Sequence, residues 1–474
     1  MKFGSVCSGI EAASIAFESV DVKPAWFSEI ENFPSSVLDF HYPNIKNYGD
    51  MNNLPKLILD EKIEAPDILC GGTPCQAFSL AGLQAGLSDE RGQLTLKFIE
   101  IANSIDYVRT KKGLNKSLIM WENVEGVLSD KTNAFGIFIA GLAGLNKPII
   151  VNKWTSSGVL YGLTRNIAWR VLDSKYFGVP QQRKRLYVIA TDTNIKPELV
   201  LFEKCKKDNY FELINLNNIY TDKESSSDTL FETKSDYTKE INGEKIEIFR
   251  QYSDCLYSAY GTKWNGNAAA YNGSLYISQN DRIRRLSPLE CERLMGFPDN
   301  YTNILNAKDT SRYKAIGNSW NIQTIEWIVS RIKNVKNLED NSWLENIDIE
   351  KVSDGYKLFM FKNNIIKITE DLMINCSLSS NNIKKSSFFD IVDTNPPEKL
   401  YISSRASNGI LRRKIEKNIK MNKRLEFLFE KQVKQLEESK FVKTIKRIEN
   451  KSITKITRVS DSQIIDKTNF MYNK

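Results

Sequence analysis

Short apolar runs alternate with longer segments of helical spacing over the first 190 residues of the chain. The apolar runs have the length of buried strands, and they cover residues 3–7, 25–28, 68–70, 118–121 and 186–190. The segments with apolar positions at helical spacing cover residues 12–20, 94–107 and 134–145. Strands and helices that alternate at this interval predict a parallel α/β sheet. Ligands bind such sheets at the carboxyl ends of the strands, so polar residues that follow each run are candidates for chemistry.

The pattern changes at about residue 192. Residues 192–282 are rich in Asn, Ser, Asp and Lys and contain no long periodic segment. The stretch 257–267 mixes aromatic, amide and glycine residues, which predicts exposed loops that carry recognition.

Regular structure is predicted again in the last 190 residues. A helix should begin after Ser287, because serine is a good N-cap, the proline after it suits the first turn and Glu290 stands three residues beyond the cap. A second apolar helix is predicted over 322–332. Residues 334–341 have the composition of a linker, and the chain after 342 is predicted to be an added C-terminal region.

The composition of the 474 residues is that of an ordinary globular protein, with 41% hydrophobic and 26% charged residues. The longest uncharged apolar run, about 134–145, is too short to cross a bilayer, and no signal peptide precedes the first strand. We therefore expect a cytoplasmic protein that is not associated with a membrane. The seven cysteines are scattered, odd in number and free of CxxC pairs, which argues against a disulfide framework and a cysteine-rich zinc site.

Positive charge is concentrated at the end of the chain. Residues 401–474 hold 19 Lys and Arg against 8 Asp and Glu, although the whole chain carries a net charge of only +8. This tail has a helical pattern over 405–447. Such a segment predicts contact with a polyanion, but a solvated charged helix has the same composition.

Cys75 follows the strand run 68–70 and two glycines, and stands between Pro74 and Gln76. A cysteine presented on such a turn can act as a nucleophile once it is ionised, whereas a buried loop cysteine is the alternative. The chain has only one histidine, His41, which nearly excludes an imidazole as the base for the thiol. Carboxylates and guanidiniums must therefore assist this cysteine.

Three further side chains suit the same chemistry. Glu122 ends the run 118–121, and burial there would raise its pKa until it could donate a proton near neutral pH. Arg183 and Arg185 alternate by two residues and can bind a carbonyl oxygen or a phosphate by forked hydrogen bonds, unless they form a solvated basic edge. A thiolate, an acid and arginines together suit addition to carbon 6 of a pyrimidine ring, which makes carbon 5 able to take a methyl group. This chemistry requires no metal.

Ordered blocks across residues 1 to about 335 make the chain resemble the DNA (cytosine-5) methyltransferase family, and its phage and bacterial branch most closely. The matching blocks are Phe3–Glu11, Gly72–Ser79, Glu122-Asn123-Val124, Gln181–Arg185, Arg284–Pro298 and Gly317-Asn318-Ser319. A single tripeptide of this kind is weak evidence, whereas all of them in the order of the family are specific. The resemblance implies that Cys75 is the nucleophile and that Glu122, Arg183 and Arg185 complete the catalytic set.

The resemblance also implies S-adenosylmethionine as the methyl donor and no metal. The residues expected to bind the donor are Cys7, Ser8, Gly9, Ile10, Glu29, Ile30, Asp50, Met51, Pro74, Asn318 and Ser319. Glu29 matches the acid that holds the ribose hydroxyls, and Asp50 the acid near the adenine. Ser5 and Cys7 stand where the family usually has an aspartate and an aromatic residue, and a cysteine cannot stack on adenine as a ring does.

The expected fold is therefore a doubly wound methyltransferase domain with a smaller target-recognition domain and a basic helical C-terminal extension. We expect the catalytic domain over 1–191, completed by 310–335, the recognition domain over 192–309 and the extension over 336–474. The target cytosine must be flipped out of the duplex, and residues 77–93 are expected to form a mobile loop that closes over it.

Double-stranded DNA is the expected partner, bound by a monomer that belongs to a restriction-modification system, to a phage, or to neither. The resemblance also implies a bacterial host cell, association with its nucleoid and, for a restriction-modification system, a cognate restriction endonuclease as a further partner. Two other functions fit the same residues: methylation of cytosine in transfer RNA, and DNA binding by a non-catalytic regulator on this scaffold.

Overall fold

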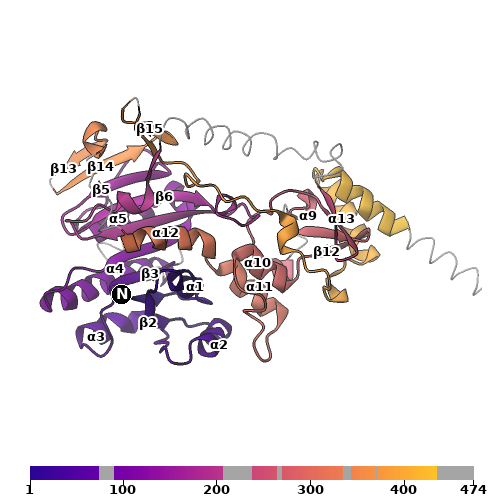
Figure 1. Cartoon of the computed structure of the whole chain (residues 1–474), viewed down its shortest axis with the longest axis horizontal. Coiled ribbons are helices and arrows are strands. Elements are labelled where there is room, and N and C mark those ends of the chain that lie inside the picture. Colours follow the sequence, from indigo (N-terminus) through magenta and orange to yellow (C-terminus); the bar gives the residue numbers. More distant parts are fainter. Residues whose placement is uncertain are drawn as a thin grey trace, which may run out of the picture. The chain divides into compact units, whose positions relative to one another are not determined.

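The computed structural model describes residues 1–73, 90–205, 237–263, 269–334, 343–353, 355–369 and 371–434 (Figure 1). Its contacts divide the chain into two compact units, each assembled from three stretches of sequence. The first unit comprises residues 1–225, 251–266 and 286–393. The second comprises residues 226–250, 267–285 and 394–474.

A nine-stranded sheet forms the centre of the first unit, in the order β13-β14-β5-β6-β7-β4-β3-β1-β2. Its strands are β1 (Lys2–Val6), β2 (Lys23–Ser28), β3 (Ile68–Gly71), β4 (Leu118–Val124), β5 (Ser157–Tyr161), β6 (Asn166–Asp173), β7 (Lys184–Thr191), β13 (Lys351–Ser353) and β14 (Tyr356–Phe361). Strands β2, β1, β3 and β4 are parallel, as predicted. The α/β fold class is thereby confirmed.

Strand β7 runs antiparallel to β4, so the prediction that 186–190 continues a parallel sheet is wrong. The cause is the chain path before it, because β5, β6 and β7 follow one another through short connections that reverse direction. A parallel crossover needs a dozen residues or more. Strands β5 and β6 were not predicted. The charged residues Arg170 and Asp173 interrupt the apolar pattern of β6, although the strand is buried along its whole length.

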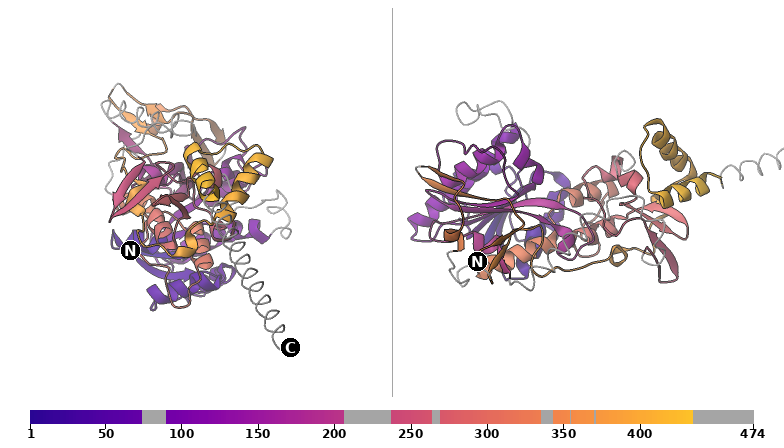
Figure 2. Two further views of the ribbon diagram at one scale, coloured as in Figure 1. Left: turned by 90° about the vertical axis from the view of Figure 1, so that its right-hand side faces the viewer. Right: turned by 90° about the horizontal axis from the view of Figure 1, so that it is seen from above.

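Helices cover both faces of this sheet (Figure 2). The helices of the first unit are α1 (Ala12–Glu18), α2 (Asn32–His41), α3 (Leu54–Leu59), α4 (Glu90–Lys111), α5 (Ala134–Ala143), α6 (Glu198–Leu201), α8 (Tyr260–Lys263), α10 (Pro288–Met295), α11 (Asp309–Asn318) and α12 (Ile322–Asn334). Helices α3, α4 and α5 pack together, while α12 packs against α1 and α6. The helices predicted over 12–20, 94–107, 134–145 and 322–332 are confirmed, with shifted ends.

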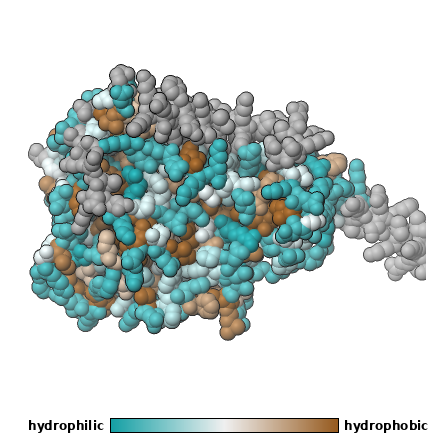
Figure 3. Space-filling model, in the orientation of Figure 1, coloured by the Kyte–Doolittle hydropathy of each residue, from teal (hydrophilic) through white to brown (hydrophobic). Residues whose placement is uncertain are grey.

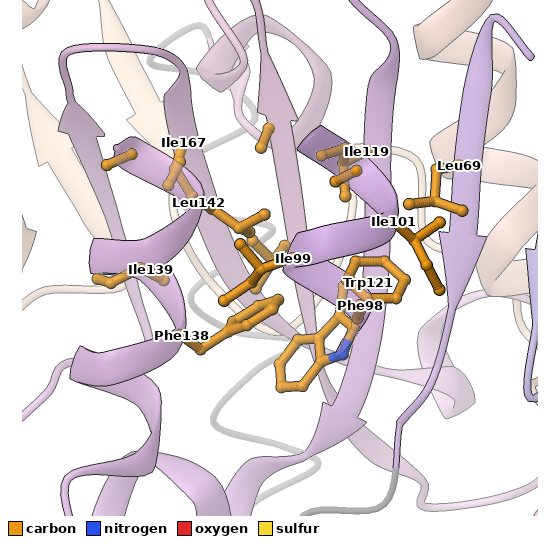
Figure 4. Close-up of a cluster of buried hydrophobic side chains, with 14 of the residues drawn as sticks. Leu69, Phe98, Ile99, Ile101, Ile119, Trp121, Phe138, Ile139, Leu142 and Ile167 are labelled. Carbon is orange, nitrogen blue, oxygen red and sulfur yellow. The ribbon is translucent and has the colours of Figure 1, made fainter. Parts of the chain in front are cut away.

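The main apolar core lies between the sheet and the helices α4 and α5 (Figure 4). Leu69 and Ile119 project from neighbouring strands toward Phe98 and Phe138, and Trp121 stacks near the ring of Phe138 at 4.2 Å between centroids. This packing fixes the strands whose carboxyl ends carry the candidate chemistry.

The predicted helix start after Ser287 is confirmed in atomic detail. The Ser287 hydroxyl accepts the Glu290 N–H at 3.2 Å, and the Glu290 carboxylate accepts the Ser287 N–H at 2.7 Å. This capping box satisfies N–H groups that a helix start leaves unpaired.

The predicted exposure of 257–267 is wrong for Tyr260, which is buried and whose ring contacts that of Tyr313 edge-on at 5.3 Å. Its hydroxyl also accepts the Leu286 N–H. Residues 264–267 lie outside the described part of the chain.

The segment 343–393 belongs to the first unit. Strand β14 pairs with β5, and the buried Arg170 donates to the carbonyl groups of Ser377 at 2.7 Å and Ser379 at 2.6 Å. A second small sheet joins β8 (Glu203–Cys205) to β16 (Met373–Asn375) and β15 (Ile365–Lys367).

The second unit contains a four-stranded antiparallel sheet, in the order β12-β11-β10-β9. Its elements are β9 (Thr238–Ile241), β10 (Glu244–Ile248), α9 (Ala269–Asn272), β11 (Tyr276–Gln279), β12 (Arg282–Arg285) and α13 (Ser404–Glu416). The packing divides the chain differently from the predicted ranges 1–191, 192–309 and 336–474. Those ranges concern function, and they stay a prediction.

Within the described residues, we find no helix with both the length and the apolar character that a membrane crossing requires. Hydrophilic side chains predominate over apolar ones on the face drawn in Figure 3.

The close approach of β14 to β5 generates a stability prediction. A Cβ atom on Gly158 would lie 2.3 Å from the ring of Trp169 and 2.5 Å from the carbonyl oxygen of Phe359. Gly158→Ala should therefore lower the free energy of unfolding by about 1–3 kcal/mol, because both neighbours are packed. Gly126→Ala is the control, since a Cβ there meets no atom within 4 Å. Equal melting temperatures of the two variants would contradict the pairing of β14 with β5.

Candidate active site

The candidate residues gather at the carboxyl ends of the parallel strands, as the topology requires. Cys7 follows β1, Glu29 follows β2, and Gly72 and Thr73 follow β3. Glu122 lies near the carboxyl end of β4, one position beyond the register pair Gly71 and Trp121.

Pro74 and Cys75 lie outside the described residues, and so does the predicted loop up to residue 89. The chain is held firmly up to Thr73. The amide of Asn123 donates to the Thr73 carbonyl at 2.9 Å, and the indole N–H of Trp121 donates to the Thr73 hydroxyl at 3.1 Å. The hydroxyl of Thr95 lies 2.9 Å from that of Thr73. The last described residue before Pro74 is therefore tied to β4 and α4.

Glu122 is a buried acid with a specific partner. Its Oε1 lies 3.1 Å from Nε of Arg185, and Trp320 hydrogen-bonds the same carboxyl group. Burial raises the pKa of Glu122, and the positive charges of Arg185 and Arg183 oppose the rise. A Cβ atom on Gly72 would lie 3.3 Å from Glu122 Oε2, a tight contact, so the chain passes close to this carboxyl group.

Arg185 reaches Glu122 because of the register between β4 and β7. Glu122 faces Tyr187, so Arg185 is its diagonal neighbour on the same face of the sheet. Arg183 precedes β7 and is 2% exposed. Its guanidinium donates to three carbonyl groups, those of Leu256 at 3.1 Å, Gly317 at 3.3 Å and Ser319 at 2.6 Å.

Arg183 therefore joins three distant parts of the chain around the site. This contact explains where the predicted block 317–319 lies. Ser319 is buried with its carbonyl on Arg183, whereas the side chain of Asn318 is exposed. Gly317 is required here, because its Cβ would lie 2.6 Å from the backbone of Tyr257.

Two residues that the sequence did not suggest complete this cluster. Cys255 Sγ accepts hydrogen bonds from Arg183 at 3.2 Å and from Arg185 at 3.5 Å. Trp320, the second, directly follows the block 317–319, and its position there was the available signal. Nothing in the sequence around Cys255 distinguishes it from the other scattered cysteines.

The loop after β1 has an unusual backbone, with Cys7 at φ 50° and Gly9 at φ 58°. The Gly9 N–H donates to Oε2 of Glu29 at 2.8 Å, and the Ser8 hydroxyl donates to the Ser5 carbonyl at 3.0 Å. Burial, with the nearby charge of Glu29, raises the pKa of Cys7 to about 12. This raised pKa disfavours the thiolate form that a nucleophilic cysteine requires.

The other predicted donor-binding residues lie around this loop. Glu29 also accepts the Glu31 N–H at 2.7 Å, and Ile30 between them is 73% exposed. Asp50 accepts the N–H of Asn52 at 2.9 Å. Two further predicted donor-binding residues, Met51 and Ile10, are buried. The sulfur of Met51 lies 3.9 Å from that of Cys7, and the carbonyl of Ile10 accepts a hydrogen bond from the Tyr301 hydroxyl at 3.0 Å.

These residues fit a donor with ribose hydroxyls and a flat base. A Cβ atom on Gly9 would meet no atom within 4 Å, so the space beside the loop is open. The carboxylate of Glu29 is fixed by two backbone N–H groups, and the exposed Ile30 offers apolar surface next to it. The described residues contain no group of three or more His, Cys, Asp and Glu side chains that could hold a metal ion.

Glu11 is a buried acid that the sequence did not single out. It is 1% exposed at φ 60°, and its Oε2 accepts the N–H and the hydroxyl of Ser14 at 3.0 and 2.6 Å. Its Oε1 finds no hydrogen-bond partner. The Glu11 carboxyl also hydrogen-bonds Ser5, which stands where the resemblance leads us to expect an aspartate.

Comparisons with known proteins agree with this geometry. The family model described as C-5 cytosine-specific DNA methylase matches residues 1–334. A protein of Escherichia phage P1 named DNA N-6-adenine-methyltransferase is 36% identical to this chain, and the match covers 70% of the chain. The chain spans 61% of the length of that relative.

Type II methyltransferases cover the same part of the chain. M1.ScrFI of Lactococcus lactis subsp. cremoris is 29% identical, and the match covers 70% of this chain and 78% of that relative. M.HhaI of Haemophilus parahaemolyticus is 27% identical, and the match covers 70% of this chain and 94% of that relative. Among solved structures, the Dnmt2 methyltransferase of S. pombe matches 72% of this chain and all of its own, at 15% identity and a TM-score of 0.43.

The burial of Glu11 generates a pH prediction. Burial raises the pKa of Glu11 from its ordinary 4.5 to about 7, so the folded chain binds this proton more tightly than the unfolded chain does. Its contribution to stability is complete below about pH 4.5 and is lost as the pH rises toward 7. Glu11→Gln, which keeps an acceptor for Ser14, should remove this loss.

Between pH 5 and pH 8, the free energy of unfolding of wild type should therefore fall by about 3 kcal/mol relative to that of Glu11→Gln. Denaturant unfolding at several pH values measures it. Glu18→Gln, at the exposed end of α1, is the control. A pH-independent difference for Glu11→Gln would contradict the raised pKa.

Proposed function

The chain belongs to the C-5 cytosine-specific DNA methylase family, and from this premise we propose how its own residues transfer a methyl group to carbon 5 of cytosine in DNA. The chain is thus an enzyme of the DNA (cytosine-5) methyltransferase class. S-adenosylmethionine, the donor that a methyltransferase of this family implies, supplies an electrophilic methyl group on a positively charged sulfur. The buried pair of Glu122 and Arg185, next to Asn123, which holds the carbonyl of Thr73, is the observation that supports the residue assignment.

The reaction begins with Cys75. Its thiolate adds to carbon 6 of the flipped cytosine, so a bond between sulfur and carbon 6 forms and the double bond between carbons 5 and 6 is broken. The electron pair moves through the ring while nitrogen 3 takes a proton from Glu122. Carbon 5 becomes nucleophilic and takes the methyl group. Transfer of the proton from carbon 5 to water then expels the thiolate, the proton on nitrogen 3 returns to Glu122, and the aromatic ring is restored.

Glu122 has the properties that this proton transfer requires. Burial raises its pKa, so the carboxyl group keeps a proton to higher pH than an exposed glutamate does. Arg185 and Trp320 fix its orientation. We propose that Arg185, held beside Glu122, assists at the exocyclic groups of the ring. Arg183 is a positioning residue, since its guanidinium donates to the carbonyl groups of Leu256, Gly317 and Ser319.

Duplex DNA is the substrate that the family implies, and transfer RNA is not favoured. We propose that the protein acts as a monomer in the cytoplasm of a bacterial cell, where DNA is accessible. Association with the nucleoid and a cognate restriction endonuclease stay predictions. A regulator without activity would bind the donor and DNA but methylate no duplex.

The name of the phage P1 relative raises a second product, N6-methyladenine. Methylation of an exocyclic amine proceeds by attack of the nitrogen itself and needs no enzyme thiol. Nucleoside analysis of DNA from cells that express the protein separates the two products. We expect 5-methylcytosine, because the blocks of this chain are those of the cytosine family.

Cys75→Ala should abolish methyl transfer while DNA binding survives, because alanine has no thiol to add to carbon 6. With donor present, wild type should become covalently bound to a duplex that contains 5-fluorocytosine, since fluorine blocks loss of the substituent from carbon 5. Denaturing electrophoresis measures the adduct. Cys255→Ala is the matched control and should still form it, although Cys255 contacts both arginines. An adduct with Cys75→Ala would refute the assignment.

Glu122→Gln should lower turnover by about 10²-fold or more, because glutamine cannot deliver the proton to nitrogen 3. Single-turnover methyl transfer with labelled donor measures the rate. Glu125→Gln, an exposed glutamate three residues further on, is the control and should leave the rate unchanged. An unchanged rate in Glu122→Gln would assign the proton to another group.

A further inference from the structure

Helix α13 (Ser404–Glu416) lies beyond the family match and is fixed within the second unit (Figure 1). The chain before it runs along the edge strand β12, where the Ile402 N–H donates to the Ile283 carbonyl at 2.9 Å. The Ser403 hydroxyl caps the helix by accepting the Ala406 N–H. Ile410 is fully buried, and the hydroxyl of Ser407 contacts Gln432 at 3.1 Å. One face of α13 is thus occupied by packing.

The opposite face of α13 carries an exposed stripe, which we define as Arg405, Asn408, Gly409 and Arg412. Their spacing of three, four and seven residues puts them on one side of the helix. Arg405, Asn408 and Arg412 are exposed. Among the described residues, Arg412 is paired with Glu416 one turn further on at 3.4 Å, where both are largely exposed. The stripe is therefore accessible to a partner.

Gly409 in the middle of the stripe has no packing explanation in the described structure. A Cβ atom placed there meets no atom within 4 Å, and the backbone is ordinary helix. Glycine inside a helix lowers stability relative to alanine. Its effect here is to leave the helix surface flat between Asn408 and Arg412, so that a flat partner can approach the backbone closely.

The charge around the stripe selects a polyanion. Residues 401–423 contain seven Lys and Arg and one Asp or Glu. Lys417 and Lys420, just beyond the helix, are exposed and suited to phosphate groups. Arginine pairs with the acceptors of guanine and asparagine with the donor and acceptor of adenine, and the major groove of DNA admits one α-helix.

We propose that the stripe of α13 enters the major groove of the DNA substrate and reads base edges there, with Lys417 and Lys420 on the flanking phosphates. This inference rests on the proposed function for the identity of the substrate. Arg405, Asn408 and Arg412 are then specificity-determining residues in a part of the chain that the family model does not match.

The experiment uses the full chain and a site selected from a randomised duplex pool by binding to wild type, so that it does not depend on methyl transfer. Fluorescence anisotropy over a salt series measures affinity for that site and for a scrambled duplex. Asn408→Ala should weaken binding to the selected site by roughly tenfold to a hundredfold and leave the scrambled duplex nearly unaffected. Lys420→Ala, the contrasting control, should weaken both equally and reduce the salt slope by about 1.

Gly409→Ala distinguishes a role of Gly409 in base recognition from a role in folding, because the two roles predict different outcomes. Alanine should raise the melting temperature of the protein, since it favours the helix, and yet weaken binding to the selected site several-fold. A higher melting temperature with unchanged binding would overturn the proposal. Equal losses on both duplexes for Asn408→Ala would also overturn it, by reducing the stripe to a non-specific polyanion contact. Absence of methyl transfer by wild type refutes the proposed function instead.

Discussion

The ion pair of Glu122 and Arg185 is the contact around which the site is organised, because it removes two charged groups almost completely from water. A buried pair of this kind is costly unless further hydrogen bonds satisfy both groups. Here Trp320 binds the carboxyl group, and Arg185 also donates to the Lys184 carbonyl at 2.8 Å. Burial raises the pKa of Glu122, whereas the positive charges of Arg185 and Arg183 oppose the rise, so burial and pairing act in opposite directions on how tightly this carboxyl group holds a proton.

The antiparallel direction of β7 makes this pair possible. It brings Arg183 and Arg185 from the amino end of β7 to the carboxyl end of β4, where Glu122 lies. Arg183 then donates hydrogen bonds to the carbonyl groups of Leu256, Gly317 and Ser319. These contacts bring segments from the second half of the chain to the site. If β7 were parallel to β4, both arginines would lie at the amino end of β4, away from Glu122.

The donor loop shows a related exchange of position. Ser5 leaves no charge at the end of β1, and Glu11 supplies a carboxyl group to Ser5 from the other side of the loop. The left-handed backbone at Cys7, Gly9 and Glu11 makes this turn possible. The loop therefore contains a buried acid at Glu11 and none at Ser5.

The order of motifs, the parallel strands β1 to β4, the capped helix after Ser287 and the family chemistry were predictable from the sequence, because each depends on neighbouring residues and short periodicity. The direction of β7, the burial of Arg170 and Arg183, and the contacts of Trp320 and Cys255 were not. Nor was the division of residues 343–434 between the two units. Only the tertiary structure decided these features, since they depend on which distant segments meet, and a buried arginine becomes stable only where carbonyl and carboxylate groups from elsewhere in the chain surround it.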